Sequence, residues 1–156
     1  MPHKDFYVMR HSASVSTAIT VMQLKAGTSA GFEIIAASVT QRGSTTSAQE
    51  EISIVRKTAA ATVTTAVVGT HIFLGDPNAS NPNLSLGTSA TGVIGTAEGT
   101  DGDIIYREGF NVLNGWQYIP VPEGRIWVPP AGIIASKFTT APAAQNWTFM
   151  IKIQEF

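Results

Sequence analysis

The feature that most constrains the fold of this chain is the strict alternation of apolar and other residues along short segments. Near the C-terminus, every second residue is large and apolar: Trp147, Phe149, Ile151 and Ile153. The segment EEISIVRK at 50–57 alternates in the same way, with Ile52 and Ile54 on one face. A repeat of two residues is that of a β-strand with one buried face. The sequence therefore predicts half-buried β-strands at these two places.

Further segments have the apolar and β-branched composition of strands: 15–26, 32–42, 61–68, 103–108, 115–121, 125–128 and 132–138. Turn-forming pairs such as Ala26-Gly27 and Asn114-Gly115 separate them, and no stretch has apolar residues at helical spacing over three turns. Short strands with regular turn signals are typical of β-sandwiches and barrels. With 156 residues, the chain has the length of one domain. We expect a single all-β domain over 1–156, an antiparallel β-sandwich of jelly-roll type with about eight strands.

Two segments fall outside this pattern. Residues 75–102 are rich in Gly, Asn, Ser, Thr and Pro, and a loop of this length in a compact domain is usually functional or ordered by a partner. It is expected to be either a surface excursion or a contact loop against a neighbouring subunit or the host. The segment 1–12 carries Phe6 and Tyr7, which are too apolar for a free terminus. We expect an N-terminal arm that adds an edge strand or extends onto a partner, while 13–156 form the sandwich.

The composition restricts the classes of function. Charged residues make up 13% of the chain and the formal net charge is -1, so no basic surface for nucleic acid is expected. The chain lacks cysteine and any apolar run of about 18 residues, so neither a disulfide framework nor a membrane-spanning segment is expected. The first residues form no apolar leader, so no secretory signal is expected. Few surface charges give little protection against self-association, which favours a homo-oligomer.

No constellation of residues in the sequence predicts catalysis. The chain has three histidines, in neither an HxH nor an HExxH arrangement: His3, His11 and His71. Asp101 and Asp103 match part of a calcium-binding loop, but its remaining ligands are absent, and a β-turn that begins strand 103–108 accounts for both residues. No G-x-S-x-G elbow or phosphate-binding loop is present. We expect no cofactor, no metal site and no enzyme activity.

Aromatic residues and prolines are concentrated in the last third of the chain. By strand alternation, Trp116 and Tyr118 share one face, whereas Trp127 faces away from both of its neighbours. The segment VPEG at 121–124 is expected to join two short strands as a hairpin. Tryptophan and tyrosine are typical both of cores and of interface anchors, and the sequence leaves both open. The candidate interface residues are Phe6, Tyr7, Met9, Arg10, Trp116, Tyr118 and Trp127.

The segment 107–156 resembles a group of virion proteins of tailed bacteriophages. The shared pattern has the form E-x-F-N-V-x-x-G-W-x-Y-x-P-x-P-E-x-R-I-x-V, followed by an apolar strand, an Ala-Pro-Ala segment and a terminal strand. Its positions in this sequence are Glu108, Phe110, Asn111, Gly115, Trp116, Tyr118, Pro120, Pro122, Glu123, Arg125, Ile126 and Val128, then Ala141, Pro142, Ala143 and Glu155. A less specific similarity extends over about residues 30 to 156.

This resemblance implies a small jelly-roll protein that decorates, or cements, a capsid. Such a protein binds and stabilises the shell of the major capsid protein on the outer surface of the virion, after synthesis in the host cytoplasm. Trimers are common among decoration proteins, so the resemblance favours a trimer over a dimer. The alternative is a head-fibre or tail-associated receptor-binding jelly-roll protein, whose aromatic residues stack on sugar rings or contact a host protein. A carbohydrate-active or cupin-type enzyme is disfavoured, because the metal-ligand and carboxylate patterns are missing.

Overall fold

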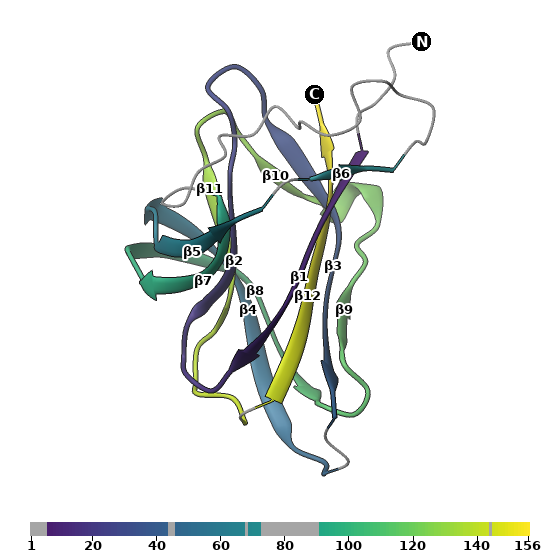
Figure 1. Cartoon of the computed structure of the whole chain (residues 1–156). Helices are drawn as coiled ribbons and strands as arrows, with labels where there is room; N and C mark the ends of the chain where they lie inside the picture. The colour runs from purple at the N-terminus through teal and green to yellow at the C-terminus, as the bar shows by residue number, and fades with distance from the viewer. Residues whose placement is uncertain (1–5, 44–45, 68, 73–90, 144) are drawn as a thin grey trace.

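Two antiparallel β-sheets pack against each other in the computed structural model, which describes residues 6–43, 46–67, 69–72, 91–143 and 145–156 (Figure 1). The first sheet contains β1 (Phe6–Val15), β3 (Phe32–Arg42), β6 (Thr70–His71), β9 (Trp116–Tyr118), β10 (Ile126–Val128) and β12 (Gln145–Glu155). The second sheet contains β2 (Thr20–Lys25), β4 (Gln49–Ala59), β5 (Thr62–Ala66), β7 (Gly92–Ala97), β8 (Thr100–Asn111) and β11 (Ile133–Phe138). Apart from one 3-10 turn, η1 (Pro122–Gly124), the described residues form no helix. The predicted antiparallel β-sandwich is confirmed.

The path of the chain alternates between the two sheets. The first sheet has the order β10-β3-β12-β1-β6, with β9 also paired to β3, and the second has the order β5-β7-β2-β11-β4-β8. The chain changes sheet at each step from β1 to β4, and again at each step from β10 to β12. This alternation favours the jelly-roll type, which stays a prediction. The strands of the described residues exceed the expected eight because β5, β6 and β7 are short additions and because β9 and β10 share one edge of β3.

The core lies between the two sheets. The apolar positions of the C-terminal alternation are all buried, because β12 is an inner strand between β1 and β3. Trp147 is fully buried, and its ring centroid lies 5.1 Å from that of Phe138, so β12 of the first sheet packs on β11 of the second. Complete burial of a side chain such as Phe138 contributes about 1.5–3 kcal/mol to folding. The alternating pattern thus supplies the main packing layer of the molecule.

Strand β1 includes residues 6–12 of the expected N-terminal arm over 1–12. It pairs antiparallel with β12 along its whole length and lies between β12 and β6. Tyr7 and Met9 are buried in the core. β6 pairs only with Tyr7 and Val8, so among the described residues the rest of β1 is an edge of the first sheet. Residues 6–12 thus add an edge strand to the sandwich, one of the two expected outcomes, because their apolar side chains lose more contact with water between two sheets than at a free terminus. Residues 1–5 lie outside the described part of the chain.

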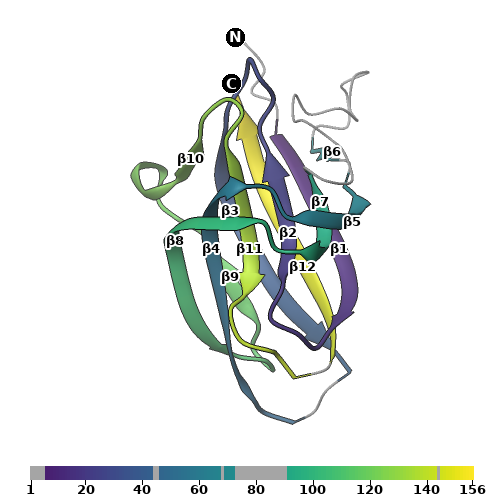
Figure 2. The same cartoon turned by 90° about the vertical axis from the view of Figure 1, so that its left-hand side faces the viewer.

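The predicted long loop over 75–102 is wrong in its C-terminal part. β7 occupies Gly92–Ala97, and β8 begins at Thr100. Together with β5, β7 crosses the outer face of the second sheet, as Figure 2 shows from that side. The sequence did not predict β7 because the strand contains glycines, and glycine has no side chain to pack and is rare in strand interiors. Residues 75–90 lie outside the described part of the chain.

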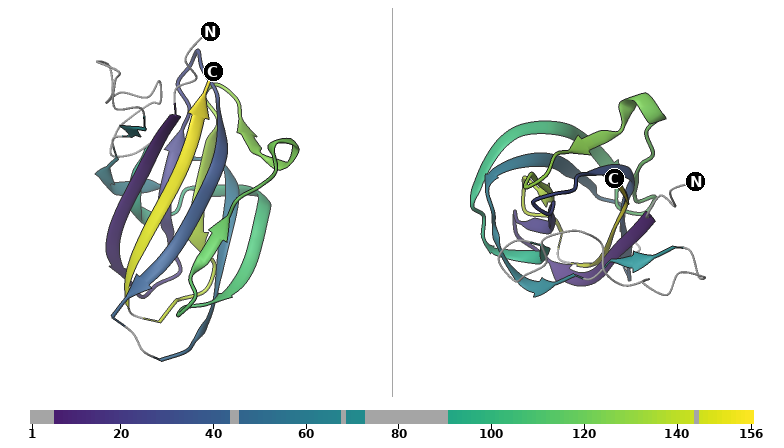
Figure 3. Two further views of the ribbon diagram at one scale, coloured as in Figure 1. Left: turned by 90° about the vertical axis from the view of Figure 1, so that its right-hand side faces the viewer. Right: turned by 90° about the horizontal axis from the view of Figure 1, so that it is seen from above.

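Strand β8 ends the second sheet and, among the described residues, pairs only with β4. The register between the two strands shifts at three places, all in the half of β8 that precedes Tyr106. Irregular pairing of this kind, together with charged side chains such as Asp103 and Arg107, keeps an edge strand from pairing with another chain. Figure 3 shows β8 on the same side of the molecule as β9, η1 and β10. This side carries the candidate functional site.

Candidate functional site

The aromatic residues of the sequence motif form a cluster inside the chain. Trp116 and Tyr118 of β9 stack with ring centroids 6.4 Å apart, and Tyr106 of β8 packs edge-on against Tyr118 at 4.9 Å. The indole Nε1 of Trp116 donates to Oε2 of Glu108 at 3.0 Å, and the Tyr118 hydroxyl donates to the carbonyl of Gly124 at 2.9 Å. A hydrogen bond to the Glu108 carboxylate raises the pKa of Tyr106, and burial raises the pKa of Tyr118. Both phenols therefore stay protonated, and the cluster closes one side of the sandwich.

Other motif residues shape the backbone between these strands. The carbonyl of Asn111 accepts hydrogen bonds from the N–H groups of Asn114 and Gly115, both at 3.1 Å. Gly115 has a φ of +70°, which glycine adopts without the strain that a side chain would bring. The guanidinium of Arg125 lies 3.5 Å from the carboxylate of Glu33 on β3. These motif residues thus build the β8–β10 side of the fold and form no catalytic group.

The predicted hairpin at 121–124 is wrong. β9 pairs with residues 37–39 of β3, and β10 pairs with residues 32–34 of the same strand, so the two short strands follow one another along one edge. Pro120 and Pro122 lack the N–H that a β-ladder needs. The chain therefore leaves the sheet after β9, makes the η1 turn, and returns to the same edge as β10.

Most candidate interface residues belong to the core. Four are buried within the chain itself: Tyr7, Met9, Trp116 and Tyr118. In the single chain these four side chains offer little exposed area to a partner, and their role as interface anchors stays a prediction. Phe6 is half-buried and Arg10 is exposed on β1, whereas Trp127 is exposed on β10. Since β12 and β3 separate β1 from β10, the structure does not bring these three together.

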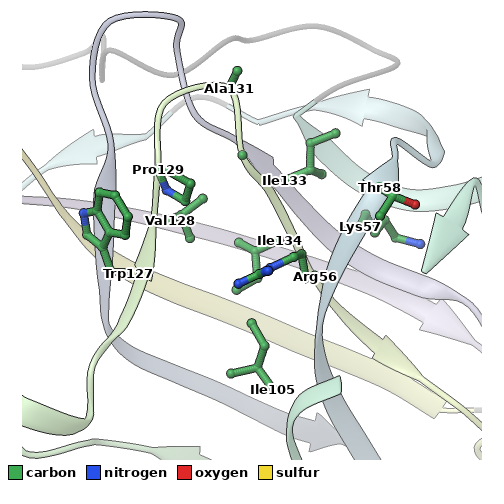
Figure 4. Close-up of a pocket in the computed structure, with 11 residues that line it drawn as sticks. Arg56, Lys57, Thr58, Ile105, Trp127, Val128, Pro129, Ala131, Ile133 and Ile134 are labelled. Atoms are coloured by element: carbon green, nitrogen blue, oxygen red, sulfur yellow. The ribbon is translucent and has the colours of Figure 1, made fainter. Parts of the chain in front are cut away.

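Trp127 stands beside a groove between the edges of the two sheets (Figure 4). The groove has a volume of about 300 Å³, and its lining includes Ile105 of β8, Val128 of β10 and Ile133 of β11. Trp127 is 56% exposed and Ile105 is 40% exposed. An accessible hollow with an apolar wall is the usual form of a binding site. This groove is the candidate functional site.

The backbone of one groove wall is fixed by hydrogen bonds. The N–H of Ala131 donates to the carbonyl of Gly27 at 2.8 Å, and the N–H of Gly132 donates to the carbonyl of Pro129 at 2.9 Å. Ala131 has a φ of +60°, a conformation that costs a residue with a side chain about 1–3 kcal/mol. A Cβ atom at Gly132 would lie 2.8 Å from the carbonyl oxygen of Pro129, so only glycine fits there. The wall is therefore formed before any ligand arrives.

Arg56 brings a positive charge into the groove. Its side chain extends from β4 toward the Trp127 side, whereas the ammonium of Lys57 points away (Figure 4). The Arg56 side chain is 61% exposed, and its Nη1 lies 3.9 Å from Oδ2 of Asp103, whose side chain is 86% exposed. An exposed pair at this distance contributes little to stability. The guanidinium thus remains accessible to a stronger partner.

Sequence reasoning identified neither Arg56 nor Ile105. The sequence does contain an indication for Arg56. It follows Ile52 and Ile54 at a spacing of two, so strand alternation places this charged residue on the inner face of the sheet. Ile105 lies at one of the register shifts between β8 and β4. No sequence pattern marks such a shift.

On the opposite face of β4, Lys57 joins a partly buried network of charges. Its side chain is fully buried, and its Nζ donates to the Glu98 carbonyl and to Oδ1 of Asp101, both at 2.6 Å. The Nζ of Lys137 lies 2.6 Å from Oδ2 of Asp101 and 3.0 Å from Oε2 of Glu98. Glu98 also accepts a hydrogen bond from the N–H of Thr20 at 2.7 Å. Two cations and two carboxylates balance, and they fasten the β7–β8 connection to the outer face of the second sheet.

The network also shifts pKa values. Burial alone would raise the pKa of Glu98, but hydrogen bonds from Thr20 and Lys137 outweigh it and lower that pKa. Burial would likewise raise the pKa of Asp101, and the bonds from Lys137 and Lys57 lower it on balance. For Lys137, burial would lower the pKa, whereas Asp101 and Glu98 raise it on balance. These three groups stay charged at neutral pH, which suits a structural brace and not proton transfer.

The predicted β-turn at Asp101 and Asp103 is wrong. Both residues lie within β8, which begins at Thr100, so they do not form a turn before a strand. Asp101 binds two lysines, and Asp103 faces Arg56. In the part of the chain that the structure describes, no three His, Asp or Glu residues gather to hold a metal ion. His11 lies in β1 and His71 ends β6, and His3 is outside the described residues.

Comparison with protein-family models, curated proteins and solved structures finds no match to this chain. The likeness to phage virion proteins therefore rests on the motif residues alone. The described residues include no helix that is long and apolar enough to cross a membrane.

Proposed function

We propose that the chain is a structural virion protein, which decorates the capsid of a tailed phage and stabilises the shell of the major capsid protein. The observation that carries this proposal is the concentration of exposed apolar side chains in one segment of the chain. Of the eight large apolar side chains exposed among the described residues, six fall in one third of the chain: Ile104, Ile105, Leu113, Ile119, Val121 and Trp127. β8, β9 and β10, which carry or flank them, lie on one side of the molecule (Figures 2 and 3).

A surface of this kind suits a protein partner. Soluble monomers rarely expose large contiguous apolar patches unless these serve as interaction sites. The charged fraction of 13% leaves little electrostatic penalty for close approach. Many copies on a shell lattice turn a small contact into strong attachment, because each bound copy shares its lattice with others. A rigid sandwich with braced edges meets the mechanical need of such a role, and the alternation of the strands between the sheets supports a jelly-roll scaffold.

The proposal includes a homo-oligomer, with a trimer favoured over a dimer. Most soluble homo-oligomers have closed symmetry, and an icosahedral shell offers local threefold positions that match a trimer. The preference for three copies comes from the resemblance alone. Of the aromatic candidates, Trp127 is the one whose exposed ring remains available for such contacts.

A receptor-binding protein of the head fibre or tail is the second candidate. The observation that favours it is the exposed indole of Trp127 beside a groove that also contains Arg56 and Thr58. An aromatic ring next to polar groups is able to stack on a sugar ring while the polar groups bind its hydroxyls. This alternative places the same groove at a host surface instead of a capsid.

Electron cryo-microscopy of purified virions that carry the chain, with quantitative mass spectrometry, separates the two candidates. Decoration predicts many copies spread over the outer shell, each where major capsid subunits meet. A few copies confined to the tail or to fibres would support the receptor-binding candidate. Purified particles that lack the chain would contradict both.

A further inference from the structure

We propose that the groove beside Trp127 binds an apolar side chain together with an adjoining carboxylate, both presented by an exposed segment of a partner protein. The identity of that partner as a shell subunit rests on the proposed function, whereas the chemistry of the groove does not. The occupant is a short protein segment that pairs a large apolar residue with Asp, Glu or a chain terminus.

The size and lining of the groove set the apolar half of the ligand. A volume of about 300 Å³ is at the lower end for ligand pockets and accommodates a single large side chain. Ile105, Val128 and Ile134, the partner of Arg56 in the β4–β11 ladder, supply an apolar wall, and the exposed indole of Trp127 stands at the side. Tryptophan and arginine are the residue types that most often dominate binding at protein interfaces. Trp127 and Arg56 lie together at this groove.

The charge of the groove determines the polar half of the ligand. Arg56 extends its guanidinium into the groove. Its Nη1 lies 3.9 Å from Oδ2 of Asp103, whose side chain is 86% exposed. An arginine side chain binds a carboxylate through two parallel hydrogen bonds, which are stronger than a single long contact. Glu98 and Asp101 are held by Lys57 and Lys137 on the opposite face of β4, so they do not compete for Arg56. A ligand carboxylate therefore has to displace only the loosely held Asp103.

The groove is pre-formed, which lowers the cost of binding. The hydrogen bonds of Ala131 and Gly132 fix the wall that follows β10. Gly31 packs closely against the end of β10, because a Cβ atom there would lie 2.6 Å from the carbonyl oxygen of Val128. The buried ammonium of Lys57 fixes the strand from which Arg56 projects. Little ordering is then left to be done when a ligand enters.

A sugar fits this groove less well than a protein segment. Sugar hydroxyls that face an apolar wall lose their hydrogen bonds to water without replacement, which costs binding free energy. The hydroxyl of Thr58, another polar group of the lining, is already directed at the carbonyl of Thr100 at 3.4 Å. The groove thus offers one strong polar contact, which matches one carboxylate.

Titration of the full chain with small probes, followed by NMR, tests this chemistry directly. The probes are 3-phenylpropionate, its uncharged analogue 3-phenylpropanamide, and methyl α-D-glucopyranoside. We expect saturable shifts of the Trp127 indole N–H and of the Ile105 and Ile134 methyl groups with the propionate, at a Kd on the order of 1 mM. The amide should bind about two- to fivefold more weakly, because it lacks the charge that Arg56 recognises. The glucoside should cause no shift.

Four variants sharpen the test. Arg56→Gln should make the propionate bind no better than the amide. Asp103→Asn removes the competing carboxylate and should strengthen propionate binding by about twofold. The controls Leu113→Ala and Arg10→Gln change an exposed apolar residue and an exposed arginine away from the groove, and they should leave all affinities unchanged. Thermal unfolding checks that each variant keeps the fold.

Several results would overturn the inference. These are equal binding of propionate and amide by the unaltered chain, propionate binding that Arg56→Gln leaves unchanged, or the absence of shifts with any probe. Glucoside binding at the same residues would also overturn it and would favour the receptor-binding candidate.

Virion occupancy separates this inference from the proposed function. If Trp127→Ala and Arg56→Gln decorate particles as fully as the unaltered chain, the docking role of the groove falls while decoration stands. If the probes bind as expected but virions lack the chain, decoration falls while the chemistry of the groove stands.

Discussion

The indole Nε1 of Trp116 donates a hydrogen bond to Oε2 of Glu108 at 3.0 Å, and this bond ties an edge of one sheet to an edge of the other. No backbone ladder joins β8 to β9 among the described residues, so side chains make the connection. The tilted contact of Tyr106 with Trp116, at a centroid distance of 6.0 Å, strengthens it. The resemblance motif therefore contains the residues that close the sandwich on this side.

Truncation of Trp116 should destabilise the fold far more than truncation of Trp127. Trp116→Ala leaves a cavity and removes the indole hydrogen bond to Glu108, and we expect a loss of about 3–5 kcal/mol in the free energy of unfolding. Trp127→Ala removes an exposed ring and should cost less than about 1 kcal/mol. Urea unfolding followed by circular dichroism measures both. Equal losses would show that the Trp127 ring also supports the core.

The N-terminal strand should be essential for folding. Met9→Ala should lower the free energy of unfolding by about 2–5 kcal/mol, because Met9 is buried between the sheets. The neighbouring exposed residue serves as control, and Arg10→Ala should change it by no more than about 0.5 kcal/mol. Deletion of residues 1–12 removes most of the strand that covers β12 and two buried core residues, and it should abolish the cooperative transition. A folded deletion variant would restore the idea of a separable arm.

Removal of the buried ammonium should be costly. Lys57→Ala leaves Asp101 with one cation in place of two and deprives the Glu98 carbonyl of its donor, so we expect a loss of about 3–5 kcal/mol. Lys152→Ala on β12 is the matched control, since Lys152 is only half-buried and should change stability by about 0.5 kcal/mol or less. Chemical unfolding at neutral pH gives both values. A small effect of Lys57→Ala would mean that water replaces the ammonium in the network.

The same network should make stability fall in acid. Folding lowers the pKa of Glu98 and of Asp101, so the unfolded state binds more protons than the folded state in that range. The stabilisation is present above their ordinary pKa values of 4.5 and 3.8, and it is lost as the pH falls through the lower folded values. Lys137 acts in the opposite sense, since its raised pKa gives stability that is complete below 10.5 and is lost as the pH rises through the folded value.

Urea midpoints at about pH 6 and about pH 3 measure the acid effect. The Asp101→Asn variant should show a smaller fall between the two conditions than the unaltered chain. Asp103→Asn is the control, because Asp103 is exposed and only loosely paired, and its fall should equal that of the unaltered chain. A fall of the same size in Asp101→Asn would place the acid sensitivity elsewhere.

Alternation predicted the strands whose inner faces are uniformly apolar, and β12 is the clearest case. It did not decide whether the N-terminal strand lies at an edge or inside, because Tyr7 and Met9 look the same in the sequence in either position. It also missed β7, where glycines break the pattern. The groove depends on the approach of Arg56 and Trp127, which lie on different sheets and far apart in the sequence. Such proximity comes from the topology of the sheets and from the register shifts of β8, and local sequence periodicity predicts neither.

The irregular pairing of β8 bears on how the protein behaves when it is crowded. A straight, regular edge is a template onto which further strands add without limit, as in amyloid fibrils. The three shifts of register against β4 bend this edge and interrupt the row of backbone groups that such growth needs. The β8 edge of a chain with few charges is thereby a poor template for open-ended addition of strands from further copies, even in concentrated solution.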